Sequence, residues 1–260
     1  MAAKFCRQET VPQCYNTPEG IIALELLVKG TREIKLQLSS GVLEKFEDYY
    51  RELMVWNQRM NLTAIVDYKE AQLKHFLDSL TTALVLPQEV RDQGKLLDIG
   101  SGGGFPGVPL KLAFPGMHLT LVDSVAKKTA FLTHLVEALE LQDVEVCTKR
   151  AEDLAMDPRF RESFDVVVSR GVASMRILME LALPFCLVGG MVVTLKKGDI
   201  SHEVAASIHA MEVLGGRIRE SREVDVDGLR DGRVLVVVDK INLSPPKFPR
   251  RPGLPAKHPL

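Results

Sequence analysis

The amino-acid sequence predicts an α/β fold with a doubly wound, mostly parallel sheet, a C-terminal antiparallel hairpin and a small helical N-terminal cap. From Lys95 onward, short apolar stretches alternate with segments of helical periodicity, which is typical of parallel strands connected by helices. Before Lys95, apolar residues recur only at helical spacing. We therefore expect an N-terminal extension and cap over residues 1–90, a sheet domain over 91–240 and a C-terminal tail over 241–260.

Two amphipathic segments form the expected cap. Apolar side chains recur at helical spacing over 39–60, and a second helical segment runs over 68–84 and ends at Pro87. Residues 1–35 carry weak signals. Residues 1–12 lack the apolar core of a signal peptide, and the apolar run 21–28 is too short to span a bilayer. We expect a cytoplasmic protein with no membrane partner.

The sheet domain begins with five short apolar stretches that we expect to be strands, over 96–99, 119–123, 144–147, 164–169 and 191–195. Helices are expected between some of them, over 126–140 and 175–183. Two further strands, 217–226 and 233–239, are close enough in sequence to pair as an antiparallel hairpin around Asp231 and Gly232.

Composition excludes several function classes. The chain has 260 residues, of which 46% are apolar, so it can bury a large core. Its 33 basic and 34 acidic side chains give a net charge of −1, so attraction to nucleic acid requires a local basic patch. The four cysteines show no metal-binding spacing and are expected to be free thiols of a reducing compartment. No metal site is expected.

The tail over 241–260 combines prolines with basic side chains and has no acidic residue. The prolines predict an extended segment without a helix that lies over the surface. The tail is either a solvated terminus or an arm that binds RNA phosphates, with Arg250 and Arg251 as contacts.

A glycine-rich loop follows the first expected strand. Gly100, Gly102 and Gly104 permit positive φ angles and close approach of a ligand, and the helix expected to begin near Pro106 exposes N–H groups suited to an anion. Gly102, Gly104 and Gly107 also satisfy the GxGxxG pattern of nicotinamide-dependent enzymes, and Asp123 lies at about the distance expected for binding the ribose of a nicotinamide cofactor. The glycine spacing alone does not decide between these ligands.

Acidic residues follow three consecutive strands of the expected sheet. Asp98 precedes the first glycine, where a negative charge suits the ammonium and sulfonium of S-adenosylmethionine better than a pyrophosphate. Carboxyl ends of parallel strands line one crevice, where Asp123 is expected to bind ribose hydroxyls and Ala151 with Glu152 the adenine edge. Asp123, Glu152 and its neighbour Asp153 are alternatively helix caps or solvated acids.

Several separated motifs, in order, closely resemble the bacterial ribosomal RNA small-subunit methyltransferase G family, also called glucose-inhibited division protein B. The resemblance covers about residues 40–260. The motifs are Trp56-Asn57, Asn61-Leu62-Thr63, His75-Phe76-Leu77-Asp78-Ser79, the loop 100–109, Asp123-Ser124 with Lys127-Lys128, Ala151-Glu152-Asp153, Ser169-Arg170 and Pro249-Arg250-Arg251-Pro252-Gly253. Gly171 departs from the family pattern, in which alanine is expected.

The resemblance implies a Rossmann-like class I methyltransferase that transfers a methyl group from S-adenosylmethionine to N7 of a guanine in the 530 loop of 16S ribosomal RNA, position 527, and releases S-adenosylhomocysteine. The implied substrate is the small ribosomal subunit or its assembly intermediate, with no obligate protein partner. The implied cofactor contacts are Gly100, Phe105, Ala151, Glu152 and Arg170.

Guanine N7 carries a lone pair and no proton, so no general base is expected and catalysis rests on orientation. The (D/N)PP(Y/F) motif that holds an exocyclic amine does not follow the fourth strand. The Pro-Cys pair that provides a nucleophile for cytosine C5 is also missing there. Arg170 holds a cofactor carboxylate, a substrate phosphate or the guanine, or forms an ordinary ion pair. His75 and Trp56 are expected to pack in the cap rather than to serve catalysis or stack on a base.

Basic side chains at or near strand ends are expected to contact RNA phosphates around the crevice, unless they are a normal scatter of exposed cations. They are Lys127, Lys128, Arg150, Lys196 and Lys197. Two other functions use the same features. One is a nicotinamide-dependent oxidoreductase that uses the glycine loop, and the other is a non-enzymatic RNA-binding assembly factor.

Overall fold

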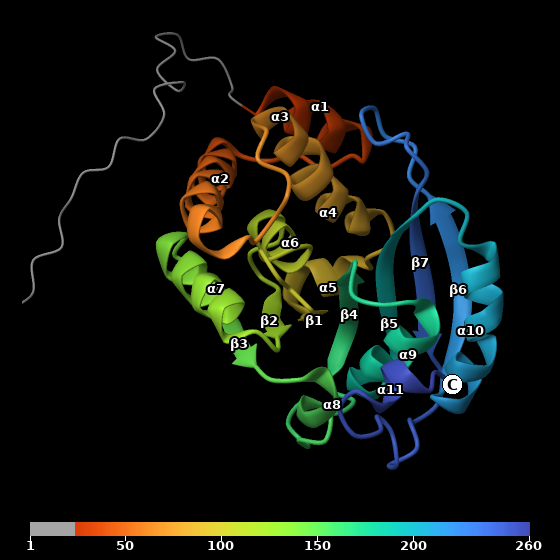
Figure 1. The fold of residues 1–260 in the computed structure, drawn as a ribbon. Helices are drawn as coiled ribbons and strands as arrows, with labels where there is room; N and C mark the ends of the chain where they lie inside the picture. Colours follow the sequence, from red (N-terminus) through yellow and green to blue (C-terminus); the bar gives the residue numbers. More distant parts are fainter. Residues whose placement is uncertain (1–23) are drawn as a thin grey trace, which may run out of the picture.

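The computed structural model describes residues 24–260 (Figure 1). The expectations for residues 1–12, and for the thiols of Cys6 and Cys14, lie outside the described residues. Cys147 and Cys186 are free thiols, as expected. Within the described part of the chain, none of the helices combines the length and apolarity needed to cross a membrane.

The described residues form a seven-stranded sheet with the order β3-β2-β1-β4-β5-β7-β6. The first five strands pair in parallel, and β7 is antiparallel to both β5 and β6. The predicted fold class is therefore confirmed. The strands are β1 (Lys95–Ile99), β2 (His118–Asp123), β3 (Val144–Thr148), β4 (Phe164–Arg170), β5 (Cys186–Lys197), β6 (Gly216–Glu223) and β7 (Arg233–Lys240).

The central strands are apolar on both faces because helices cover both sides of the sheet. In β4, Val166 and Val168 belong to one hydrophobic cluster, and Val167 belongs to the cluster on the other face. The strand order reverses at β1 and β4, which is where doubly wound sheets open a crevice beyond the carboxyl ends of their strands.

The cap contains the two predicted helical segments and others that the sequence did not indicate. Helix α2 coincides with the expected segment, and the side chain of Ser39 caps it by accepting from the Val42 N–H. The segment expected over 68–84 is helical but divided by a π-helical stretch, η1. The elements are α1 (Glu25–Glu33), α2 (Ser40–Met60), α3 (Tyr68–Ala71), η1 (Gln72–Leu77), α4 (Asp78–Leu80), η2 (Thr81–Leu84) and α5 (Gln88–Gln93).

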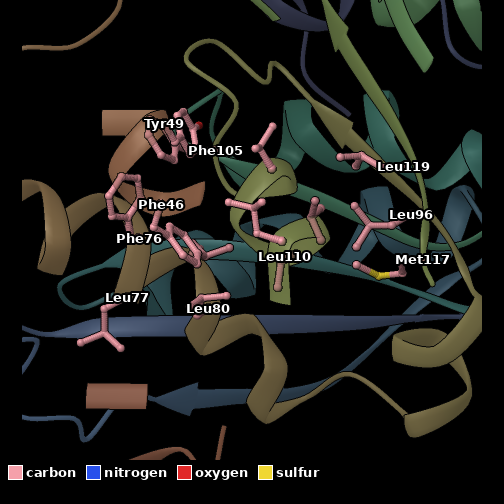
Figure 2. Close-up of a cluster of buried hydrophobic side chains, with 14 of the residues drawn as sticks. Phe46, Tyr49, Phe76, Leu77, Leu80, Leu96, Phe105, Leu110, Met117 and Leu119 are labelled. Atoms are coloured by element: carbon pink, nitrogen blue, oxygen red, sulfur yellow. The ribbon is translucent and has the colours of Figure 1, made fainter. Parts of the chain in front are cut away.

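The cap and the sheet share one hydrophobic core. Figure 2 shows the rings of Phe46, Tyr49 and Phe76 from the cap beside Phe105 of the glycine loop, with Leu110 and the strand residues further along. The predicted division between residues 90 and 91 falls inside α5. Burial against the sheet therefore stabilises the cap helices and fixes them over the crevice.

The remaining helices flank the sheet, and α10 was not expected. They are α6 (Gly107–Ala113), α7 (Ala126–Ala138), α8 (Ala151–Leu154), α9 (Met175–Ala182), η3 (Leu183–Phe185), α10 (Ser201–Val213) and α11 (Leu254–Lys257). The predicted pairing of β6 with β7 as an antiparallel hairpin is confirmed, and the connection over 224–232 contains Asp231 and Gly232, although β6 ends at Glu223 rather than at the predicted residue 226.

The structure corrects the prediction that the tail has no helix. Helix α11 forms with Pro255 in its first turn, where the missing N–H costs no hydrogen bond. The side chain of Phe248 is buried in a core cluster. The guanidinium of Arg161 donates to the carbonyls of Ser244 and Phe248. The tail is therefore a packed part of the fold.

Candidate cofactor site

The glycine loop between β1 and α6 is pressed against the cap. Gly104 has a φ of 95°, and a Cβ placed there would lie 2.6 Å from the hydroxyl oxygen of Tyr49. That hydroxyl donates to the carbonyl of Gly103 across 2.5 Å. The close approach that glycine permits at this position is therefore to the cap helix α2 rather than to a ligand.

Asp98 lies beneath the loop and is completely buried. Its Oδ2 accepts from the Gly107 N–H across 2.8 Å, whereas Oδ1 has no hydrogen-bond partner among residues 24–260. Burial raises the pKa of Asp98 to about 7. The structure corrects the expectation that this helix N-terminus offers its N–H groups to an anion, because the Gly107 N–H already donates to the carboxyl group of Asp98.

A groove with a volume of about 300 Å³ lies at the carboxyl edge of the sheet. It brings together four of the predicted cofactor residues, namely Gly100, Asp123, Ala151 and Glu152. The other predicted cofactor residues do not line it: Asp98, Gly102, Gly104, Phe105 and Arg170. A second hollow of about 400 Å³ lies at the opposite edge, but ligands of doubly wound sheets bind at the carboxyl edge.

Asp123 ends β2 and is held in one orientation. Its Oδ2 accepts from the Gly102 N–H across 3.1 Å, and its Oδ1 accepts from the Val125 N–H across 2.9 Å. The Lys128 ammonium lies 3.8 Å from Oδ2. Because each carboxylate oxygen has a second lone pair, the side chain can still accept from two hydroxyls of a ligand in the groove.

Glu152 and Asp153 are separated by the structure, although the sequence placed them together. Glu152 is buried and lines the groove, and its Oε1 accepts from the Gly253 N–H of the tail across 3.0 Å. Asp153 is exposed on α8 and does not line the groove. Of the two acids, Glu152 is the one positioned to contact a ligand.

The side chain of Phe105 points to the cap. Its ring stacks on that of His75, with centroids 4.4 Å apart and planes at 14°, and on that of Tyr49, with centroids 5.2 Å apart. The guanidinium carbon of Arg170 lies 4.8 Å from the centroid of the Phe105 ring. Phe105 thus joins the glycine loop to the cap and to the end of β4.

Arg170 takes part in a cluster of three charges around the buried carboxylate of Asp78, in which both guanidiniums are partly buried. Its Nη1 donates to Asp78 Oδ2 across 2.8 Å and to the carbonyl of Lys74 across 3.0 Å. The Nη1 of Arg233, from the start of β7, lies 2.7 Å from Asp78 Oδ1. Two guanidiniums share the Asp78 carboxylate, and Nε of Arg233 also lies 3.1 Å from Asp231 Oδ1. The sequence did not indicate Arg233, whose only signal was its place at a strand start.

His75 packs in the cap, as expected. Burial and the nearby Arg170 lower its pKa to about 3, so the ring is neutral. Its Nε2 lies 2.8 Å from Thr63 Oγ1, and its Nδ1 lies 3.3 Å from Arg170 Nη2. Trp56 is half-buried and packs against the rings of Phe131 and His134.

The basic residues predicted to contact RNA fall into two groups. Lys127 and Arg251 are exposed, as is the ion pair of Lys197 with Asp231. Lys196 instead donates to Glu203 across 2.7 Å, and Arg250 pairs with the fully buried Glu180. Both cations are thus committed within the protein.

Comparison with known proteins gives consistent matches over most of the chain. The family model described as rRNA small subunit methyltransferase G matches residues 42–225. The ribosomal RNA small subunit methyltransferase G of Dehalococcoides mccartyi (strain CBDB1) is 47% identical, over 90% of this chain and 98% of that protein. The protein of the same name from Roseiflexus castenholzii is 44% identical, over 86% of this chain and 94% of that protein.

A solved structure shows the same fold at low sequence identity. It is a SAM-dependent methyltransferase from Aquifex aeolicus, with a TM-score of 0.50 and 16% identity over 67% of this chain and 94% of that one. This likeness concerns the arrangement of the sheet and its helices.

Proposed function

The chain belongs to the rRNA small subunit methyltransferase G family, and from this premise we propose that it methylates N7 of a guanine in the 530 loop of 16S ribosomal RNA. The protein is an rRNA methyltransferase that uses S-adenosylmethionine. The observation that carries the proposed site is the groove at the carboxyl edge, where Gly100, Asp123 and Glu152 meet.

The charges around the glycine loop fit this cofactor. Asp98 has a buried Oδ1 without a partner among the described residues, which a cationic ligand group near the loop can compensate electrostatically. The pyrophosphate of a nicotinamide cofactor would lie at the glycine loop, above the carboxyl group of Asp98, while Asp123 suits the ribose of either cofactor. The position of Asp98 therefore supports S-adenosylmethionine over NAD(P).

We assign the following roles to the groove residues. Asp123 accepts from the ribose hydroxyls, and Glu152 with the backbone of Ala151 contacts the adenine edge. Asp98 compensates the positive charge of the methionine end, and Gly100, Gly102 and Gly104 shape the loop around it. When bound, S-adenosylmethionine supplies an electrophilic methyl group.

The methyl acceptor requires no general base in this mechanism, since guanine N7 carries no proton. The neutral His75 agrees with this, because its two ring nitrogens face Thr63 and Arg170 inside the protein. The protein's contribution is to hold cofactor and guanine in line, which by itself can supply a large part of the rate enhancement.

Arg170 is assigned to the RNA rather than to the cofactor. It does not line the groove, while the next two residues, Gly171 and Val172, do. Its guanidinium, held by Asp78 at the end of β4 next to the groove, is suited to a phosphate or to the guanine oxygen. We place the Arg170 guanidinium at the boundary between cofactor and substrate, where it packs on the ring of Phe105.

RNA phosphates are assigned to the exposed cations Lys127, Lys197 and Arg251, and to the half-buried Lys128 at the groove. Lys196 and Arg250 are not assigned to RNA, because Glu203 and Glu180 neutralise them within the protein. The substrate is the small subunit or its assembly intermediate, so the protein acts in the cytoplasm.

The proposed function is tested with methyl-labelled S-adenosylmethionine and small ribosomal subunits that lack the modification. After digestion of the RNA, mass spectrometry should find the label in 7-methylguanosine. Label in another nucleoside would overturn the N7 assignment. RNA binding without label would favour an assembly factor, and binding of NADPH without binding of S-adenosylmethionine would favour an oxidoreductase.

A further inference from the structure

The tail following β7 crosses one face of the sheet from its amino edge to its carboxyl edge. Strand β7 runs antiparallel to β5, with its start beside the end of β5 and its end on the amino side, since Arg233 pairs with Lys197 and Asp239 with Met191. The tail then reaches α8 and α9, beside which α11 lies (Figure 1). The C-terminal residues therefore come to the edge of the sheet that carries the cofactor groove.

Arg250 anchors the tail to a carboxylate that is completely buried. Its Nε donates to Glu180 Oε1 across 2.8 Å, and its Nη2 donates to Oε2 across 2.6 Å. The backbone N–H of Arg250 donates to the same Oε1 across 2.9 Å. Because a buried carboxylate requires compensation, this three-bond contact fixes the tail more firmly than an exposed ion pair would.

Three residues beyond this anchor, the tail touches the cofactor groove itself. The Gly253 N–H donates to Oε1 of Glu152, whose carboxylate has no other hydrogen-bond partner among residues 24–260. Gly253 has a φ of 81°, a left-handed conformation that directs the chain from the anchor into α11. One oxygen of Glu152 is thus held by the tail, which leaves the other for a ligand in the groove.

We infer that the C-terminal segment 249–260 is a built part of the cofactor site, in which Arg250 is a positioning residue that acts through Glu152. The Arg250–Glu180 contact fixes the Gly253 N–H, and this N–H orients the Glu152 carboxylate toward the groove. The inference rests on the proposed function, because it takes the groove as the binding site of S-adenosylmethionine. It also gives Arg250 a role other than binding RNA.

The neighbouring Arg251 provides a matched control. It has the same charge and lies in the same turn, but its side chain is exposed and forms no hydrogen bond or ion pair within residues 24–260. A general effect of tail charge on cofactor or RNA should appear in Arg251→Ala as well as in Arg250→Ala. An effect through Glu152 should appear only in Arg250→Ala.

The test is calorimetric titration of the full-length protein and its variants with S-adenosylmethionine. Arg250→Ala should raise Kd about tenfold, the equivalent of one oriented hydrogen bond, while Arg251→Ala stays within about twofold. In the background of Glu152→Ala, Arg250→Ala should change Kd by less than about twofold, since the residue through which it acts is gone. If the fold-changes in Kd from the two substitutions multiply in the double variant, the inference is overturned. An unchanged Kd for Arg250→Ala would overturn it as well.

A second variant covers the case in which Arg250→Ala does not fold. Arg250→Lys keeps the charge but cannot form the bidentate contact, so its Kd should lie between those of the wild type and Glu152→Ala. A folded Arg250→Lys protein with the wild-type Kd would overturn the inference. So would effects of Arg250→Lys and Glu152→Ala on Kd that multiply in the double variant. No binding of S-adenosylmethionine by the wild-type protein would instead overturn the proposed function, and the inference with it.

Discussion

Asp78 Oδ2 lies 2.8 Å from Nη1 of Arg170 and thereby ties the cap to the carboxyl end of β4. The other oxygen of the same carboxylate lies 2.7 Å from Nη1 of Arg233, so the strands β4 and β7 are joined through one buried side chain of the cap. The positions of both guanidiniums beside the groove thus depend on Asp78.

Asp78→Asn should reduce methyl transfer strongly while leaving the Kd for S-adenosylmethionine within about twofold. The neutral amide leaves the partly buried Arg170 without its counter-charge and leaves Arg233 with Asp231 alone, so the free energy of unfolding should fall by roughly 1–3 kcal/mol. Denaturant unfolding and single-turnover kinetics measure the two effects. Asp48→Asn, in an exposed pair with Arg51, is the control and should change neither. Equal loss of cofactor binding in Asp78→Asn would contradict the separation of the cluster from the groove.

Asp123→Ala should raise the Kd for S-adenosylmethionine at least about tenfold, because it removes the acceptor assigned to the ribose hydroxyls. The matched control is Asp153→Ala, which removes an exposed carboxylate outside the groove. Isothermal titration calorimetry compares the two variants. Equal affinities for Asp123→Ala and the wild type would refute the role given to Asp123.

Affinity for S-adenosylmethionine should rise with pH and level off above about pH 7. Burial raises the pKa of Asp98 to about 7, so below that pH the carboxyl is mostly protonated and must lose its proton to compensate a cation. Titrations at several pH values, in buffers of different ionisation enthalpy, measure Kd and proton release together. Asp98→Asn should bind more weakly and lose this pH dependence; a variant that keeps the full dependence would assign it to another group.

The same shift has a consequence for stability, in the opposite direction. The folded pKa of Asp98 lies above its unfolded value, so between about pH 4 and 7 the unfolded state ionises first and stability falls as pH rises. The free energy of unfolding of Asp98→Asn should depend less on pH over this window than that of the wild type. Urea unfolding at pH 4.5 and 7 gives the comparison, and parallel profiles for the two proteins would contradict the buried position of Asp98.

Gly104→Ala should destabilise the protein more than Gly189→Ala. Both glycines have a φ of 95°, so an alanine is strained by a similar amount at either position. A Cβ at Gly104 would also lie 2.6 Å from the Tyr49 hydroxyl oxygen, whereas nothing lies within 4 Å of one at Gly189. The difference in the free energy of unfolding should be roughly 1–3 kcal/mol. Equal losses would mean that the loop does not pack tightly on α2.

The sequence was sufficient for the features that depend on local pattern. Alternating apolar stretches predicted the parallel strands, and Asp123 and Glu152 could be placed in one crevice because carboxyl ends of parallel strands share an edge. Long-range pairs could not be predicted in this way. Asp78 and Arg170 are 92 residues apart, and Glu180 and Arg250 are 70 apart, so only the fold shows that these charges compensate one another.

Local propensity also failed where tertiary contacts decide the structure. The prolines of the tail indicated an extended chain, but burial of Phe248 and the contacts of Arg161 and Arg250 hold it against α9 in a defined path. The same limitation applies to Phe105, whose aromatic ring gave no indication that it packs on His75 of the cap.

Methylation of guanine N7 in the 530 loop, through the groove that contains Asp123, can be mapped directly on the RNA. Unmodified small subunits are treated with the protein and S-adenosylmethionine. Borohydride reduction and aniline then cleave the RNA at 7-methylguanosine, and primer extension maps the cleavage. We expect one new stop within the 530 loop, greatly weakened for Asp123→Ala at limiting cofactor. A stop elsewhere, or no stop while labelled methyl enters the RNA, would show that the methyl group goes to another position.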